Sequence, residues 1–162
     1  MTARTLRLGR LEVRITGARA ALAGRMDDAS PLTEIAAALP PGDVVIECGG
    51  VTFVNSFGTR EWLRLLRALS ERGTVTLERV ADALMTQMNL IPEFAERARI
   101  TSFHAQYLCP ACGAHAAPLI DAVAHAAQLA AMRMPPVTCR ECGAAMESAD
   151  FPERYLCLFS AG

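Results

Sequence analysis

Two similar pairs of cysteines limit what the second half of this 162-residue chain can fold into. The pairs are Cys109-Pro-Ala-Cys112-Gly and Cys139-Arg-Glu-Cys142-Gly. Two residues between paired cysteines let one tight turn present both sulfurs to the same ion, and four thiolates satisfy a tetrahedral Zn²⁺ at about 2.3 Å. The glycine after each pair tolerates a positive φ, so the backbone can turn its N–H groups toward the thiolates. This spacing predicts one zinc site, with two structural disulfides or a chance spacing as the alternatives.

The N-terminus and the most apolar stretch of the chain indicate a cytoplasmic protein. Residues 1–6 lack the charged segment and following apolar run that mark a secretory signal peptide. Residues 114–134 are apolar but contain Asp121, Gln128 and Arg133, which makes them too polar for a membrane span. A reducing cytosol favours metal thiolates over disulfides, which supports the zinc interpretation.

The chain is long enough for one well-buried core and a smaller module. We predict a main domain over residues 1–105 and a zinc-ribbon module over residues 106–162. The 26 residues between the cysteine pairs exceed the usual ribbon spacing, and their Ala-rich stretch 121–132 predicts a helix in the connecting loop. The short apolar run 155–159 predicts a closing strand.

Alternating strand and helix patterns predict an α/β fold for the main domain, with helices packed on an open sheet. The hairpin at 6–16 alternates apolar and polar residues around a Gly9-Arg10 turn. Ser30 and Pro31 are typical of a helix start. The continuous apolar run 44–46 predicts a central strand covered by helices on both faces. The remaining predictions are strands at 20–23, 51–54, 75–77 and 99–103 and helices at 59–71 and 82–88.

Three segments of the main domain form a recognisable pattern through their order and spacing. They are Leu22-Ala-Gly24-Arg-Met-Asp27, Val44-Val-Ile-Glu47 and Val51-Thr-Phe53-Val54-Asn55-Ser56-Phe-Gly58. With them, residues 11–103 resemble the STAS domain, the fold of anti-sigma factor antagonists. The resemblance implies a STAS-like mixed β-sheet with helices packed on it, and a protein-binding role. In that family, partner kinases phosphorylate the serine at the position of Ser56. The unphosphorylated surface binds an anti-sigma factor with a kinase-like ATP-binding fold, and phosphorylation releases it.

The resemblance departs at Asn55, where the family usually has aspartate. If the aspartate orients the serine or contacts the kinase, the amide weakens phosphorylation and leaves shape recognition intact. Capping of the following helix by Asn55 or Ser56 is the alternative role of these two residues. A phosphate on Ser56 would be stabilised by the N–H groups and the dipole of the helix start.

The helix predicted at 59–71 carries a basic face next to Ser56. Its arginines recur at helical spacing, and the opposite face carries Trp62 and three leucines that we predict to be core. The basic face should point outward, where it either meets an acidic partner surface or is simply solvated. We therefore predict a partner-binding site that comprises Asn55, Ser56, Gly58, Arg60 and Arg64.

Charge and motifs weigh against nucleic-acid binding and catalysis. The net charge is −1, lysine is absent, and from Cys109 onward three arginines face five acidic residues. The basic footprint that attracts nucleic acid is therefore missing. The chain has no P-loop and no Ser/His/Asp arrangement that would indicate an enzyme. We expect a non-enzymatic bacterial signalling protein that binds an anti-sigma factor or another kinase-like regulatory protein. A zinc ribbon that contacts nucleic acid or the transcription machinery is the alternative.

Overall fold

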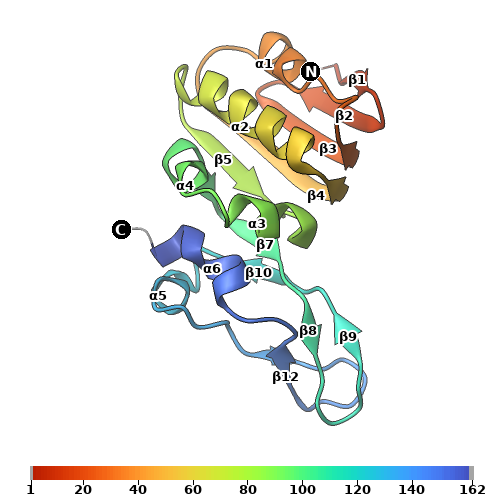
Figure 1. Cartoon of the computed structure of the whole chain (residues 1–162), viewed down its shortest axis with the longest axis vertical. Helices are drawn as coiled ribbons and strands as arrows, with labels where there is room; N and C mark the ends of the chain where they lie inside the picture. Colours follow the sequence, from red (N-terminus) through yellow and green to blue (C-terminus); the bar gives the residue numbers. More distant parts are fainter. Residues whose placement is uncertain (1, 161–162) are drawn as a thin grey trace.

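A six-stranded sheet forms the N-terminal part of the chain in the computed structural model, which describes residues 2–160 (Figure 1). Its strands lie in the order β1-β2-β3-β4-β5-β6. The first three pair antiparallel, and β3 to β6 pair parallel. The sheet is therefore mixed, and the prediction of an α/β fold is confirmed. The strands are β1 (Arg4–Leu8), β2 (Leu11–Thr16), β3 (Arg19–Met26), β4 (Val44–Val54), β5 (Val75–Glu78) and β6 (Arg99–Ile100).

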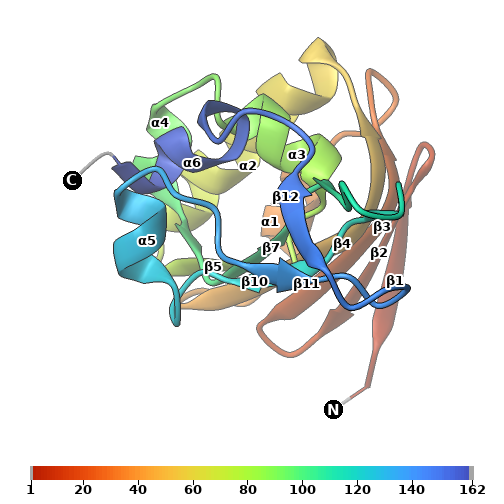
Figure 2. The ribbon, with the colours of Figure 1, turned by 90° about the horizontal axis from the view of Figure 1, so that it is seen from below.

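Four helices cover one face of this sheet (Figures 1 and 2). The longest, α2, buries Trp62, Leu65 and Leu69 at spacings of three and four residues, so its predicted core face is confirmed. α3 has the predicted bounds, and its Met85 and Met88 are buried. The helices are α1 (Thr33–Ala38), α2 (Ser56–Ser70), α3 (Asp82–Met88) and α4 (Glu93–Arg97).

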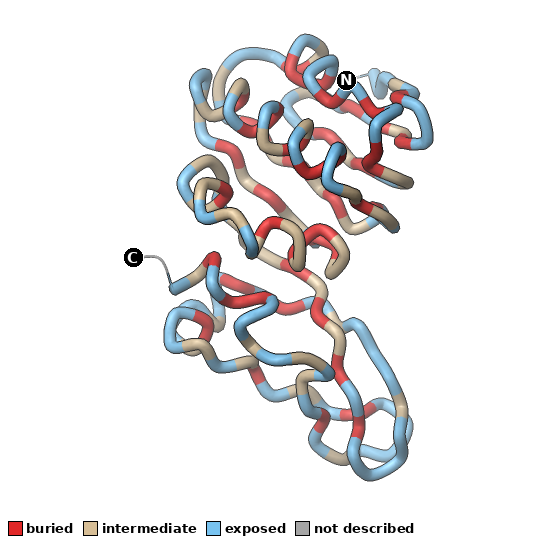
Figure 3. The backbone as a smooth tube through the Cα atoms, in the orientation of Figure 1, coloured by how far each residue is buried: buried red, intermediate tan, exposed pale blue. Residues whose placement is uncertain are grey.

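The opposite face of the sheet is open and charged. Along β4 the buried residues alternate with half-buried Val45 and Glu47, and Figure 3 shows the buried residues where helices meet the sheet. Ion pairs cross this face, from Arg19 to Glu78 and from Arg79 to Glu47 at 3.9 Å. The prediction that the strand is covered on both faces is wrong. Because the parallel strands follow in one direction across the sheet, right-handed crossovers place every helix on the same side.

Two predicted boundaries in the first crossovers are also wrong. α1 begins at Thr33, and Ser30 does not cap it. Ser30 is buried instead, and its hydroxyl donates to the carbonyl of Arg25 at 3.1 Å, which ties down the loop after β3. The predicted strands 44–46 and 51–54 are parts of one strand, β4, because the two glycines between them remain extended and Gly50 pairs with Ala23 of β3.

The C-terminal part of the chain forms two smaller sheets. The strand predicted at 99–103 divides at Thr101, because β6 pairs with β5 while β7 pairs with β10. A four-stranded sheet has the order β11-β12-β8-β9. The helix predicted at 121–132 is present but shorter, since β10 and a turn occupy its first residues. The elements are β7 (Ser102–His104), β8 (Tyr107–Leu108), β9 (His115–Ala116), β10 (Leu119–Asp121), α5 (Ala126–Ala130), β11 (Val137–Thr138) and β12 (Ala145–Ser148).

The apolar run 155–159 lies in a helix, α6 (Glu153–Ser160), so the predicted closing strand is wrong. Tyr155, Leu156 and Leu158 are buried, whereas Cys157 is exposed. Burial at these positions follows one side of a helix and not the alternation of a strand. The helix packs against α3, α4 and α5, and these contacts bury its apolar side.

Contacts made by α6 join the C-terminal part to the helices on the large sheet. The side chain of Asn89, at the end of α3, accepts the N–H of Leu158 at 3.1 Å and donates to the carbonyl of Glu153. The rings of Phe103 and Phe159 lie 5.3 Å apart between their centroids. These contacts join residues on the two sides of the domain boundary predicted after residue 105. The division into two domains stays a prediction. Within residues 2–160, no helix combines the length and apolar character that a membrane crossing requires.

Candidate functional site

The four cysteines predicted as zinc ligands lie together, although they come from two separate hairpins. Their sulfur atoms all lie within 4.8 Å of one another. The sulfurs of Cys109 and Cys142 are 3.6 Å apart, and those of Cys112 and Cys139 are 3.7 Å apart. Sulfurs placed about 2.3 Å from a central zinc form a tetrahedron with edges of about 3.8 Å, whereas a disulfide spans about 2.0 Å. The cluster can therefore hold a metal ion, and its distances do not suit disulfides.

The two cysteine turns have the same backbone geometry. Gly113 and Gly143 adopt φ values of 78° and 77°, as the sequence predicts. The N–H of Gly113 donates to the carbonyl of Cys109 at 2.8 Å, and the N–H of Gly143 donates to that of Cys139 at 2.9 Å. Each turn thus folds back tightly enough to aim both of its sulfurs at one point.

Burial and charge differ among the four thiols. Cys109 and Cys139 are buried, and Cys112 and Cys142 are exposed. The backbone N–H of Cys112 is the main cause that lowers the pKa of Cys109 to about 7. The N–H of Ala114 lowers the pKa of Cys112, but desolvation and the neighbouring sulfurs outweigh it and raise that pKa to about 12. A divalent cation at the centre would favour the thiolate form of all four.

The ligand set is made of sulfur alone. Within residues 2–160, the cluster that could hold a metal ion contains the four cysteines and no histidine or carboxylate. His104 instead contacts the carbonyl of Ala117 through Nδ1 at 2.8 Å. Four protein ligands fill a tetrahedral shell, whereas a catalytic zinc keeps one position open for water or substrate. The donor set thus suits a structural zinc.

Asn55, and not Ser56, caps helix α2. The Asn55 carbonyl oxygen Oδ1 accepts the N–H of Gly58 at 2.9 Å, and its backbone carbonyl accepts the hydroxyl of Thr59 at 3.0 Å. Ser56 is the first residue of the helix and is exposed. The capping alternative therefore applies to Asn55, which leaves the Ser56 hydroxyl directed to solvent at the positive end of the helix.

Gly58 is buried where α2 approaches the end of β3. A β-carbon at this position would lie 2.1 Å from the carbonyl oxygen of Met26. The N–H of Asn55 donates to that same oxygen at 3.2 Å. Gly58 therefore belongs to the packing of the helix on the sheet, and of the five predicted partner-binding residues it is the one that is buried.

The sequence prediction missed Phe57, which lies between Ser56 and Gly58. Its side chain is 52% exposed in the first turn of α2. The guanidinium of Arg60 lies 5.7 Å from the centre of its ring, and both residues border a shallow hollow next to the loop at 28–31. Phe57 lies more than 100° from the centre of the buried face of the helix, and this offset was the signal in the sequence. An exposed aromatic beside a cation forms a surface suited to protein contacts.

The predicted basic face of α2 is partly neutralised within the molecule. Arg64 pairs with Glu61 at 2.8 Å. Arg67 forms two hydrogen bonds with Glu93 of α4, at 2.8 and 2.6 Å. Arg60 has no ion pair among the residues that the structure describes. The free positive charge of this face is therefore nearest to Phe57 and Ser56.

No protein-family model, curated protein or solved structure matches this chain. The geometry of its own residues is therefore the evidence for both candidate sites. Figure 1 shows them in different parts of the fold, with α2 on the large sheet and the hairpins β8-β9 and β12 at the far end of the C-terminal part.

Proposed function

We propose that this chain is a bacterial signalling protein that binds another protein and catalyses no reaction. The exposed side chain of Phe57, flanked by Ser56 and Arg60, is the observation that carries the proposal. Large aromatics and arginines dominate the energetics of protein interfaces, and Phe57 is 52% exposed. The exposed side of the N-terminal half of α2 is therefore the partner-binding surface, which we name the α2 surface: Asn55, Ser56, Phe57, Arg60 and Arg64.

The partner class follows from the resemblance of residues 11–103 to the STAS domain. An anti-sigma factor or another regulatory protein with a kinase-like ATP-binding fold would contact the α2 surface. Phosphorylation of Ser56 would add a charge of about −1.5 to −2 at the helix start and beside the Phe57 ring. That charge would be stabilised by the helix N–H groups in the free protein and would weaken an apolar contact with the partner.

The C-terminal part binds a structural zinc ion in this proposal. Cys109, Cys112, Cys139 and Cys142 would be its ligands, and their spacing matches the edges of a tetrahedron of sulfurs. The ion would link the β8-β9 hairpin to the β11-β12 hairpin. These strands have two to four residues each, so the metal would supply stability that their small core does not.

Affinity capture with the full chain from the source bacterium tests the α2 surface. Phe57→Ala should lose the partner, and Ser56→Asp should weaken its capture. Phe151→Ala is a matched control, because Phe151 is an equally large ring, 76% exposed, in the C-terminal part. A partner captured equally by wild type and Phe57→Ala would refute the proposed surface.

Mass spectrometry of the protein from its native cells tests the switch separately. Phosphate on Ser56 in at least one growth state is the expected result. Its absence in every growth state would remove the switch, while the capture experiment would still decide whether the α2 surface binds a partner.

A further inference from the structure

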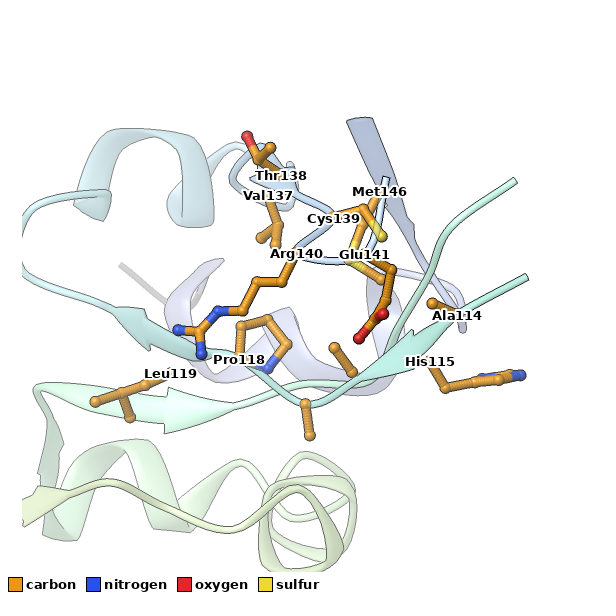
Figure 4. Close-up of a pocket in the computed structure, with 12 residues that line it drawn as sticks. Ala114, His115, Pro118, Leu119, Val137, Thr138, Cys139, Arg140, Glu141 and Met146 are labelled. Atoms are coloured by element: carbon orange, nitrogen blue, oxygen red, sulfur yellow. The ribbon is translucent and has the colours of Figure 1, made fainter. Parts of the chain in front are cut away.

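A second surface lies between the two cysteine-bearing hairpins, far from α2 in the chain. It is a hollow of about 390 Å³ (Figure 4). Both outer strands of the four-stranded sheet, β9 and β11, border it, and Met146 of the inner strand β12 also lines it. Two edges of one sheet therefore face the same space.

The backbone hydrogen bonds show which groups these edges leave free. The backbone N–H of Cys109 donates to the carbonyl of Ala114, and the backbone N–H of Cys139 donates to the carbonyl of Ala144, both at 2.8 Å. Opposed residues of an antiparallel ladder alternate between bonded and unbonded pairs. The N–H and carbonyl groups of His115 and Thr138 therefore point away from the neighbouring strands β8 and β12. Such an unpaired edge is a template for another extended chain.

The side chains around the hollow are apolar with two charges of opposite sign. Leu119 is 46% exposed, and Val137 and Met146 contribute further apolar surface. Arg140 and Glu141 have no ion-pair or hydrogen-bond partner among residues 2–160. In Figure 4 the Arg140 guanidinium extends toward Pro118 and Leu119, and the Glu141 carboxylate lies toward the other end of the hollow.

We propose that this hollow binds an extended segment of a partner protein, which adds as a β-strand between β9 and β11. Main-chain groups of the segment would pair with the free edge groups of His115 and Thr138. An acidic side chain of the segment would meet Arg140, and an apolar side chain would pack on Leu119. Because Glu141 repels a second acid, the two charges also fix the direction of the segment. This surface shares no residue with the α2 surface and is independent of it.

Random 12-residue peptides displayed on phage are the probe. They are panned on the full-length protein after removal of clones that bind Arg140→Glu. The expected consensus has an acidic residue two positions from an apolar one, as alternate side chains of a strand require. The synthetic consensus peptide should bind Arg140→Glu at least about tenfold more weakly than wild type by fluorescence anisotropy. Leu119→Glu, a change at an exposed residue, should weaken binding as well.

Controls separate this surface from a folding defect and from the α2 surface. Arg133→Glu removes an exposed arginine outside the hollow and should leave the affinity for the peptide unchanged. Phe57→Ala should also leave it unchanged. Equal metal content in all variants, by elemental analysis, verifies that the cysteine turns are intact.

N-methylation of the peptide tests the strand geometry. Successive N–H groups of a strand point to opposite sides, so one set of alternate residues would pair with β9 and the other set with β11. Methyl groups on either set should therefore weaken binding. No enriched sequence, equal affinity for wild type and Arg140→Glu, or unchanged affinity after methylation of either set would each overturn the proposal. A wild-type dimer in light scattering that Arg140→Glu converts to monomer would also overturn it, because the occupant would then be a second copy of this chain.

Discussion

The side chain of Asn55 holds the first turn of α2 by accepting the backbone N–H of Gly58 at 2.9 Å. This bond fixes the backbone that presents Ser56 and Phe57 to solvent. An aspartate at the same position would make the same bond through a carboxylate oxygen. The asparagine therefore gives this turn the same local shape that an aspartate would give, and differs from it only in charge.

Asn55→Ala and Asn55→Asp should move stability in opposite directions. Loss of the cap in Asn55→Ala should lower the free energy of unfolding by about 1 kcal/mol. Asn55→Asp keeps the cap and places a negative charge at the helix start, which should add about 0.3–1 kcal/mol at low ionic strength. Urea unfolding followed by circular dichroism measures both. Equal destabilisation by the two substitutions would show that the capping bond is not made.

Gly58→Ala should destabilise the protein although alanine normally favours a helix over glycine. The added methyl would lie 2.1 Å from the Met26 carbonyl oxygen, so α2 has to move off β3. We expect a loss of about 1–3 kcal/mol in the free energy of unfolding. Ser56→Ala, an exposed neighbour, should change it by less than about 0.5 kcal/mol. A gain in stability for Gly58→Ala would contradict the close packing of α2 on β3.

The ion pair between α2 and α4 should make stability depend on acidic pH. The hydrogen bonds from Arg67, with further help from Arg97, lower the pKa of Glu93 from 4.5 to about 2. A carboxyl group with a lowered pKa in the folded state stabilises the fold above its unfolded pKa. Its contribution is therefore complete above about pH 4.5 and is lost as the pH falls toward about 2.

Glu93→Gln removes this dependence. The difference in urea midpoint between wild type and Glu93→Gln should be largest at neutral pH and should shrink between about pH 4.5 and 2. Glu96→Gln, an exposed change on the same helix, should give no such pH-dependent difference. A difference for Glu93→Gln that is constant over this pH range would contradict the role of the Arg67 pair.

Metal removal should unfold the cysteine hairpins. Elemental analysis should find about one zinc ion per chain, and a chelator should make residues 107–148 sensitive to protease. Cys112→Ser should lose the zinc, whereas Cys157→Ser should retain it, because Cys157 is exposed on α6 and lies outside the cluster. Purified protein without zinc, or hairpins whose protease resistance ignores the chelator, would contradict the structural metal.

The features that the sequence predicted correctly depend on neighbours along the chain. The CxxCG turns, the buried face of α2 and the bounds of α3 each arise from residues within four positions of one another. Local spacing determines whether two sulfurs point to the same side of a turn or two leucines lie on the same face of a helix. The predicted grouping of Cys109 with Cys139 succeeded for a further reason, because identical turns of this kind usually share one ion.

The features that sequence analysis missed depend on distant contacts. A run such as 155–159 is apolar enough for either a strand or a helix, and Asn89 and Phe103, which bind it as a helix, lie more than 50 residues away. The open face of the sheet follows from the handedness of all crossovers together. The hollow beside Arg140 is formed by residues of both outer strands, which are distant in the sequence, so no local pattern indicates it.

Because α6 packs on Asn89, the side of α3 is covered only after the C-terminal end of the chain has been synthesised. Asn89 and Glu153 are 64 positions apart, and contacts between residues so distant in the chain are slow to form. In the proposed holoprotein, zinc closes the intervening hairpins and so shortens the search. When zinc is scarce in the cell, Phe103 and the side of α3 would then stay exposed to proteases for longer. The supply of zinc would therefore determine what fraction of newly made protein escapes degradation.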